Sequence, residues 1–282
     1  MVSQTLHAIR RRWLCGPLCI WGKLPAHGDF LRRNTTAAHT RDWQNWVTRV
    51  WNLRPLPQAL RTPRARPGFS SNWTQLEPPK VLPDLGSVPV NFVMQPGVLP
   101  FSGRHYVQGV VMASQDQVGR AFPLIVFQQV SPSWMRRTWG VQRPGNIVGS
   151  TLPVAGSDSK DLLFWVSRLM ARTHGADMGW ADFVMAVEAL DALHSPDWRS
   201  LLGAATTPPD RKALHALLST YCDADTQDAA YGLRGVQQLP WSNWPSRILR
   251  TENPSNAFWQ QDLRGGYINA SESLHGLWGA RS

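Results

Sequence analysis

The chain has 282 residues, of which 43% are hydrophobic, and a formal net charge of +10 at pH 7. This length suffices for a large domain with a real hydrophobic core, and this composition excludes an intrinsically disordered protein. No uninterrupted apolar run reaches the ~18 residues that a membrane-spanning helix needs, so we expect no integral membrane segment.

The positive charge is concentrated in the first half of the chain. Residues 1–130 contain 15 Lys and Arg against 5 Asp and Glu, whereas residues 131–282 contain 14 of each kind. Such a basic half can mark an acidic partner, a nucleic acid or an anionic membrane surface, or can be a solvated face. Because the Arg residues are scattered and no zinc-finger or RNA-binding signature accompanies them, we expect no nucleic-acid partner.

Residues 1–20 predict a flexible leader, followed by a single domain over residues 21–282. A basic stretch at residues 10–12 precedes an apolar one, as in a secretory signal, but Gly16 and Pro17 interrupt the apolar part. A secretory signal needs ~7–15 apolar residues and then a cleavage site with small side chains. We therefore expect a cytoplasmic protein.

The cysteines indicate neither a disulfide framework nor a metal site. Cys15, Cys19 and Cys222 are odd in number, and Cys15 and Cys19 lack the two-residue separation of common zinc ligands. This pattern favours a reducing compartment and predicts no metal site. We also expect no cofactor.

The chain begins with a short strand that leads into an ordered loop up to Phe30, and then a helix. Thr35 or Thr36 can cap that helix. Its apolar residues recur at positions i, i+3, i+4 and i+7, and these are Trp43, Trp46, Val47 and Val50. The prolines at positions 55 and 57 predict its end.

Two runs rich in β-branched and aromatic residues, at residues 106–112 and 121–130, predict an antiparallel hairpin at the centre of the sheet. Pro123 cannot donate to a strand ladder, so it marks the start of the second strand. That strand is apolar without alternation, which is typical of a strand buried on both faces. A further strand is predicted over residues 88–94.

The second half of the chain is predicted to be largely helical. After a loop region at residues 131–157, apolar periodicity predicts helices that begin near residue 158, at about 181–193 and at about 210–221, and residues 233–282 are predicted to be loop-like. Strands before helices, with one early helix, indicate an α/β fold. We expect a central, mostly antiparallel or mixed sheet flanked by helices, as a three-layer α/β/α sandwich.

Two polar loops form the candidate site. Its residues are Lys23, Asp29, Ser114, Asp116 and Arg120. If the two loops meet at the edge of the sheet, two carboxylates and several cations would face each other. Such a network could be catalytic, could bind an anion, or could pin the loops together, since buried ion pairs often fix geometry.

An enzyme is the alternative. Ser114 could act as a nucleophile with Asp116 and a histidine, either His27 or His105, in a hydrolase or small-anion-binding enzyme. The segment lacks the strand-to-helix elbow with flanking Gly that many such nucleophiles use. Ser and Asp in turns mostly bond their own backbone, which favours a structural role.

Both loops resemble motifs of the TagF/ImpM family. The stretch Trp21-Gly22-Lys23-Leu24-Pro25-Ala26-His27-Gly28-Asp29-Phe30 resembles its opening GKLP-x-x-GDF motif, and residues 114–124 resemble its S-x-D-x-VGR-x-FPL segment. The motif positions carried over are Gly22, Lys23, Pro25, Gly28, Asp29, Phe30, Ser114, Asp116, Gly119, Arg120 and Pro123. The resemblance implies an α/β sandwich and a cytoplasmic accessory protein of bacterial type VI secretion without an established enzymatic activity.

In some systems, members of this family restrain secretion post-translationally through a scaffold protein with a forkhead-associated (FHA) domain. We therefore predict a non-enzymatic regulatory or accessory protein that acts by protein–protein interaction. The expected partners are type VI secretion components, the FHA-domain scaffold among them.

Overall fold

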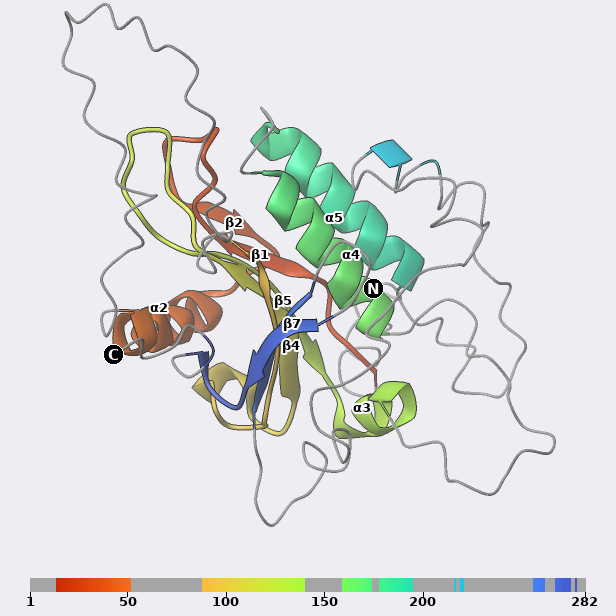
Figure 1. Ribbon diagram of the computed structural model, residues 1–282. Helices are drawn as coiled ribbons and strands as arrows, with labels where there is room; N and C mark the ends of the chain where they lie inside the picture. The colour runs from red at the N-terminus through yellow and green to blue at the C-terminus, as the bar shows by residue number, and fades with distance from the viewer. Residues whose placement is uncertain are drawn as a thin grey trace, which may run out of the picture.

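The computed structural model describes residues 14–51, 88–139, 159–173, 178–194, 216, 219–220, 256–261, 267–274 and 277. Within these ranges seven strands form one sheet in the order β2-β1-β5-β4-β3-β6-β7, and each neighbouring pair is antiparallel (Figure 1). The strands are β1 (Cys19–Gly22), β2 (Leu31–Arg33), β3 (Val90–Met94), β4 (Tyr106–Met112), β5 (Leu124–Val130), β6 (Ala257–Gln261) and β7 (Tyr267–Ser271). The helices are α2 (Ala37–Trp51), the 3₁₀ turn η2 (Pro100–Ser102), α3 (Pro132–Trp139), α4 (Ser159–Arg172) and α5 (Trp180–His194).

The predicted central hairpin is confirmed as β4 and β5. The two strands pair antiparallel from Tyr106 opposite Val130 to Met112 opposite Leu124, and β5 begins directly after Pro123. Every residue of β4 is buried, as are six of the seven in β5. The hairpin is therefore the centre of the sheet, with β1 on one side and β3 on the other.

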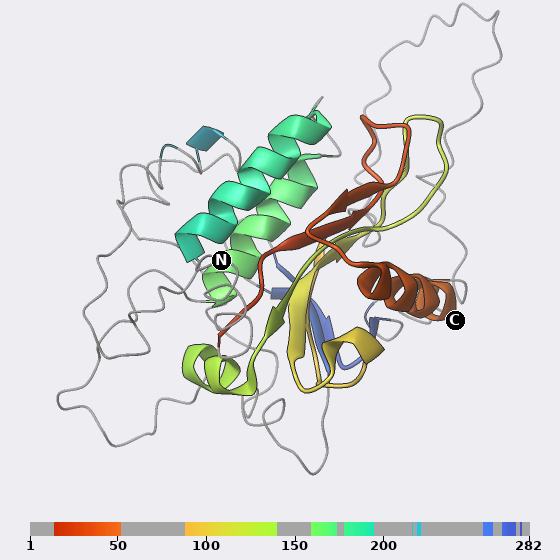
Figure 2. The same ribbon diagram turned by 180° about the vertical axis from the view of Figure 1, so that it is seen from behind.

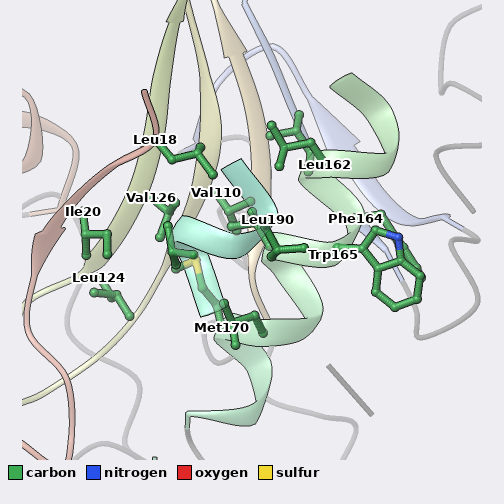
Figure 3. Packing of buried hydrophobic residues seen from close by; sticks show 14 of the residues in the cluster. Leu18, Ile20, Val110, Leu124, Val126, Leu162, Phe164, Trp165, Met170 and Leu190 are labelled. Atoms are coloured by element: carbon green, nitrogen blue, oxygen red, sulfur yellow. The ribbon is translucent and has the colours of Figure 1, made fainter. Parts of the chain in front are cut away.

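Alternation along the strands divides the buried side chains between two faces of the sheet. In β4, Val110 and Met112 belong to one hydrophobic cluster and Val107 and Val111 to the other. Helices α4 and α5 cover the first face, where Leu162 and Met170 of α4 and Leu190 of α5 pack with strand residues such as Val110 and Val126 (Figure 3).

Helix α2 packs on the opposite face (Figure 2). Thr36 caps its start, because its Oγ1 accepts a hydrogen bond from the backbone N of His39 (3.2 Å). The ring of Trp43 contacts Phe92 of β3 and Phe127 of β5 edge-on. The α/β class with an antiparallel sheet is confirmed. The three-layer sandwich stays a prediction.

The boundary predicted for the leader at residue 20 is wrong. Residues 19 and 20 belong to β1, which pairs with β5, and Cys15 forms a bridge with Val130. Leu14 and Leu18 are buried in the first cluster. Residues 14–20 are therefore part of the domain, because their apolar side chains complete its core; residues 1–13 lie outside the described part.

Two further segments differ from the sequence-based expectation. The loop predicted from residue 131 contains α3, where Ser131 Oγ accepts a hydrogen bond from the backbone N of Trp134 (3.2 Å) and Pro132 occupies the first helical position. The tail predicted to be loop-like contributes β6 and β7, and β6 pairs with β3 from a distant part of the chain. The helices predicted near residue 158 and at 181–193 are confirmed as α4 and α5, and most of the helix predicted at 210–221 lies outside the described residues.

Gly109 in β4 provides a test of this packing. A Cβ atom at this position would overlap the carbonyl oxygen of Val126 and lie 2.7 Å from Cζ of the Phe92 ring. Because overpacking a dense core forces backbone shifts, we predict that Gly109→Ala lowers the free energy of unfolding by about 2 kcal/mol in urea denaturation. Gly16→Ala is the matched control, since its Cβ would lie 3.8 Å from the carbonyl oxygen of Gln129, an ordinary van der Waals contact. Equal effects of the two substitutions would contradict this account.

Candidate functional site

Two loops lie side by side beyond one end of the sheet (Figures 1 and 2). The first loop (residues 23–30) joins β1 to β2, and the second loop (residues 113–123) joins β4 to β5. Since β1 pairs antiparallel with β5, the end of β1 is next to the start of β5, and both loops leave the sheet together. The backbone N of Gln117 in the second loop donates to the carbonyl oxygen of His27 in the first (3.0 Å). We call residues 23–30 and 113–123 together the paired loops.

Two motif glycines make this arrangement possible. Gly22 has a φ of +134°, and a Cβ there would overlap the carbonyl oxygen of Pro123. Gly119 has a φ of +84° and closes a turn in which its backbone N donates to the carbonyl oxygen of Asp116 (2.9 Å). A larger residue at Gly22 would push the first loop away from the second.

Asp116 is the centre of the polar site and is buried. Its Oδ2 accepts hydrogen bonds from Lys23 Nζ (2.9 Å) and from Arg120 Nε (2.6 Å). Its Oδ1 accepts from the backbone N of Arg120 (2.7 Å) and of Val118 (3.2 Å). The carboxylate therefore has four donors around it, two of them cationic, and it joins the two loops across 93 residues of sequence.

These contacts keep Asp116 ionised. Burial by itself would raise the pKa of its carboxyl group, but the hydrogen bond from Lys23 and those from the backbone and side chain of Arg120 hold the pKa well below its usual value of 3.8. The positive charge of Lys23 acts in the same direction. Asp116 is therefore a fixed negative charge near neutral pH and is unsuited to act there as a general base.

Lys23 and Arg120 complete the cluster in different ways. Lys23 is buried, and its ammonium also donates to the carbonyl oxygen of Arg120 (3.2 Å). The Arg120 side chain is 62% exposed, and its Nη2 donates to the carbonyl oxygen of Gly28 in the first loop (2.8 Å). Both cations thus connect the loops, but the Arg120 guanidinium also faces solvent.

Three aromatic rings pack beside this cluster, and the sequence analysis did not predict their contact. Phe30 stacks on Trp21 of β1 with centroids 6.1 Å apart and contacts Phe122 of the second loop edge-on at 4.7 Å. The ammonium of Lys23 is 5.1 Å from the centroid of the Phe30 ring. An aromatic residue near the end of both motifs was the available signal, but their pairing requires the fold.

The side chains of the other two predicted site residues, Asp29 and Ser114, make no hydrogen bond to this cluster within the described part of the chain. Asp29 is exposed, and within the described ranges its carboxylate makes no ion pair; its backbone N donates to His27 Nδ1 (3.2 Å). The predicted meeting of two carboxylates is therefore wrong, because the first loop turns this side chain outward. Ser114 is buried, its carbonyl oxygen accepts from the backbone N of Phe122 (2.9 Å), and its Oγ has no hydrogen-bond partner among the described residues.

The geometry places no histidine in hydrogen-bond contact with Ser114 Oγ within the described residues, as the enzyme alternative would require. A triad needs Ser114 Oγ hydrogen-bonded to a histidine nitrogen, and neither His27 nor His105 supplies that contact in the described part of the chain. In the same ranges no group of three or more His, Cys, Asp or Glu is placed to hold a metal ion, and no described helix is long and apolar enough to cross a membrane.

The comparisons with known proteins concern the region of the second loop. Residues 82–142 match the family model of the TagF N-terminal domain, described as type VI secretion system-associated. The described part of this range holds β3, β4, the second loop, β5 and α3. The resemblance to the TagF/ImpM family is thereby confirmed for this region, whereas the first loop lies outside the matched range and is bound to it through Asp116.

The crystal structure of PA0076 from Pseudomonas aeruginosa PAO1 is similar to this chain with a TM-score of 0.44 and 19% sequence identity, over 86% of this chain and 81% of that one. A search of curated proteins finds no match.

The burial of the ion pairs predicts unequal roles for the two loop carboxylates. Asp116→Ala would leave the buried Lys23 ammonium unpaired, and we expect it to lower the free energy of unfolding by about 3–5 kcal/mol. Asp29→Ala, the matched control, is expected to leave the urea midpoint unchanged, since its exposed carboxylate has no described partner. Comparable losses from both substitutions would contradict the claim that Asp116, and not Asp29, holds the loops together.

The pKa of Asp116 predicts a dependence of stability on pH. Because that pKa is lower in the folded chain than the unfolded value of 3.8, the contribution of the carboxylate is fully present above that value and is lost as pH falls below it. We expect the difference in free energy of unfolding between wild type and Asp116→Asn to stay constant from pH 7 to about 5 and to shrink below about pH 4. Urea denaturation at several pH values measures this; a constant difference down to pH 3 would contradict it.

Proposed function

We propose that this chain regulates a bacterial type VI secretion system post-translationally through protein–protein contact. The premise is that residues 82–142, which match the family model, form a TagF N-terminal domain. The match to a type VI secretion system-associated domain is the observation that carries this proposal. The protein would act in the cytoplasm as an accessory protein, not as a component that spans the membrane.

The chemistry of the paired loops supports a contact function over catalysis. Both oxygens of Asp116 are occupied by donors, and the ammonium of Lys23 is bound to Asp116 and to the carbonyl oxygen of Arg120. A general base needs a free lone pair and a pKa near the working pH, and Asp116 has neither. These groups instead hold two loops in one shape, which suits a surface that another protein recognises.

The partner we propose is the FHA-domain scaffold protein of the secretion system, as the family resemblance implies. Binding to a scaffold would change the activity of assembled components without changing their synthesis. We propose no nucleic-acid partner, because the basic residues of the first half are not gathered into a nucleic-acid-binding motif.

A hydrolase or small-anion-binding enzyme that uses Ser114, Asp116 and a histidine is the second candidate. The observation in its favour is the buried Ser114 Oγ, which has no hydrogen-bond partner in the described part of the chain. Its burial counts against it, since a nucleophile must reach a substrate, and Asp116 is already bound on both oxygens.

Deletion of the gene tests the regulatory proposal. We expect deletion to raise the amount of secreted components of the type VI secretion system in the culture medium, because an inhibitor of the assembled secretion apparatus is removed. Their transcripts and total cellular amounts should stay unchanged, which quantitative mass spectrometry and transcript counting measure.

Complementation supplies the control for this experiment. The wild-type chain should restore the parental level of secretion, and so should Met185→Ser, whose exposed side chain belongs to α5 and not to the paired loops. Altered transcript levels in the deletion strain would contradict post-translational action, and unaltered secretion would contradict the regulatory role itself.

A further inference from the structure

The paired loops carry most of the exposed large apolar side chains that the described residues contain. These are Phe30, with 42% of its surface exposed, and Val118, with 70% exposed; the third such residue, Met185, lies on α5. Phe30 ends the first loop and Val118 lies in the middle of the second. Arg120, two residues after Val118, donates to the carbonyl oxygen of Gly28, two residues before Phe30, and so connects the two regions.

Val118 has no packing role that would explain an apolar residue. It lies in the turn closed by the hydrogen bond from Gly119 N to the carbonyl oxygen of Asp116, and its own backbone N donates to Asp116 Oδ1. These bonds are made by the backbone and would form with a polar side chain, which is what such turns usually contain. Its apolar character is therefore available to a binding partner.

Phe30 is an aromatic anchor that is already ordered. Its ring is held by Trp21, by Phe122 and by the ammonium of Lys23, yet almost half of its surface faces solvent. Burial of a side chain with a fixed orientation loses little conformational entropy on binding. Aromatic residues of this kind, next to an Arg, dominate the energy of many protein interfaces.

Arg120 adds an oriented positive charge. A guanidinium has five N–H donors, and here Nε donates to Asp116 and Nη2 donates one hydrogen bond to Gly28, which leaves three donors without a partner among the described residues. The Asp116 carboxylate is already saturated by four donors. The exposed guanidinium can therefore bind a carboxylate supplied by another molecule.

Further charged side chains follow the first loop in β2 or belong to the loop itself. Arg32 of β2 is exposed, Arg33 pairs with Glu188 of α5, and Asp29 is the exposed acid of the first loop. Of the charged side chains named here, the cations Arg32, Arg33 and Arg120 outnumber the acids Asp29 and Glu188, which favours an acidic partner.

We propose that the surface formed by Phe30, Val118 and Arg120 binds an acidic segment of a partner protein. A carboxylate of that segment accepts hydrogen bonds from the free donors of Arg120, and a neighbouring apolar side chain covers Phe30 and Val118. The inference rests on the proposed function, because that function requires a protein partner, and it adds which atoms of this chain recognise the partner and what they recognise.

Site-specific photo-crosslinking in cells that carry the secretion system tests this. Gln117, an exposed residue next to Val118, is replaced by p-benzoyl-phenylalanine in the full-length chain, and Met185 is replaced in a control strain. We expect the probe at Gln117 to link to one protein through a peptide rich in Asp and Glu, and the probe at Met185 not to link to that peptide.

Two variants of Val118 with opposite charges then distinguish the effect of charge on the crosslink yield from the effect of losing the apolar side chain. Val118→Asp and Val118→Arg both remove the apolar side chain from a position that the fold does not need, so both should fold. We expect Val118→Asp to reduce the crosslink yield at least tenfold relative to Val118→Arg. Equal yields from the two Val118 variants would overturn the proposal.

The outcomes distinguish this inference from the proposed function. A crosslink from Gln117 to a secretion component through a neutral or basic peptide, to a second copy of this chain or to nucleic acid overturns the acidic-segment proposal. The absence of any crosslink from Gln117 overturns it as well. The proposed function fails separately, if deletion of the gene leaves secretion unchanged.

Discussion

A single buried carboxylate determines how the two loops of this protein are arranged. Asp116 receives donors from Lys23 and Arg120 and from two backbone N–H groups of its own turn. An ionised carboxylate without such donors would be expensive to bury, so the charge and its partners stabilise the arrangement only together. Removal of any one of these groups would leave a buried charge or donor without its partner, which is energetically unfavourable. The loops therefore keep the arrangement in which all of these groups are paired.

The sheet supplies the rigid support for this cluster. Strands β1, β5 and β4 are hydrogen-bonded neighbours, and the paired loops connect their ends to β2 and to each other. Apolar clusters on both faces of these strands fix their positions, and Gly22 allows the first loop to approach Pro123. The side chains at the tips of the loops are therefore pre-organised, which would lower the conformational entropy lost if the proposed partner binds there.

Local patterns in the sequence were sufficient for the elements with strong periodicity. The β4–β5 hairpin, the cap of α2 at Thr36 and the apolar faces of α4 and α5 follow from neighbouring residues. The meeting of Lys23, Asp116 and Arg120 was also predicted, because two motifs placed charged residues in loops that could share one end of the sheet.

Elements that depend on distant partners were not predicted. β6 is a five-residue strand that pairs with β3 across more than half of the chain, and a short segment with two glutamines carries little local strand signal. The direction of the Asp29 side chain depends on the local turn with His27, which the residue types do not determine. In contrast, α3 was missed although Ser131 and Pro132 form a recognisable helix start.

Hydrogen exchange is the most direct test of our proposal that the paired loops are the surface of this chain that a type VI secretion component recognises. The purified full-length chain would be measured by mass spectrometry alone and with the purified FHA-domain scaffold of the same secretion system. The account predicts slower exchange in peptides that cover residues 23–33 and 113–123, with no change in α5. A complex whose protection is confined to other elements, or the failure of the two proteins to form a complex, would contradict it.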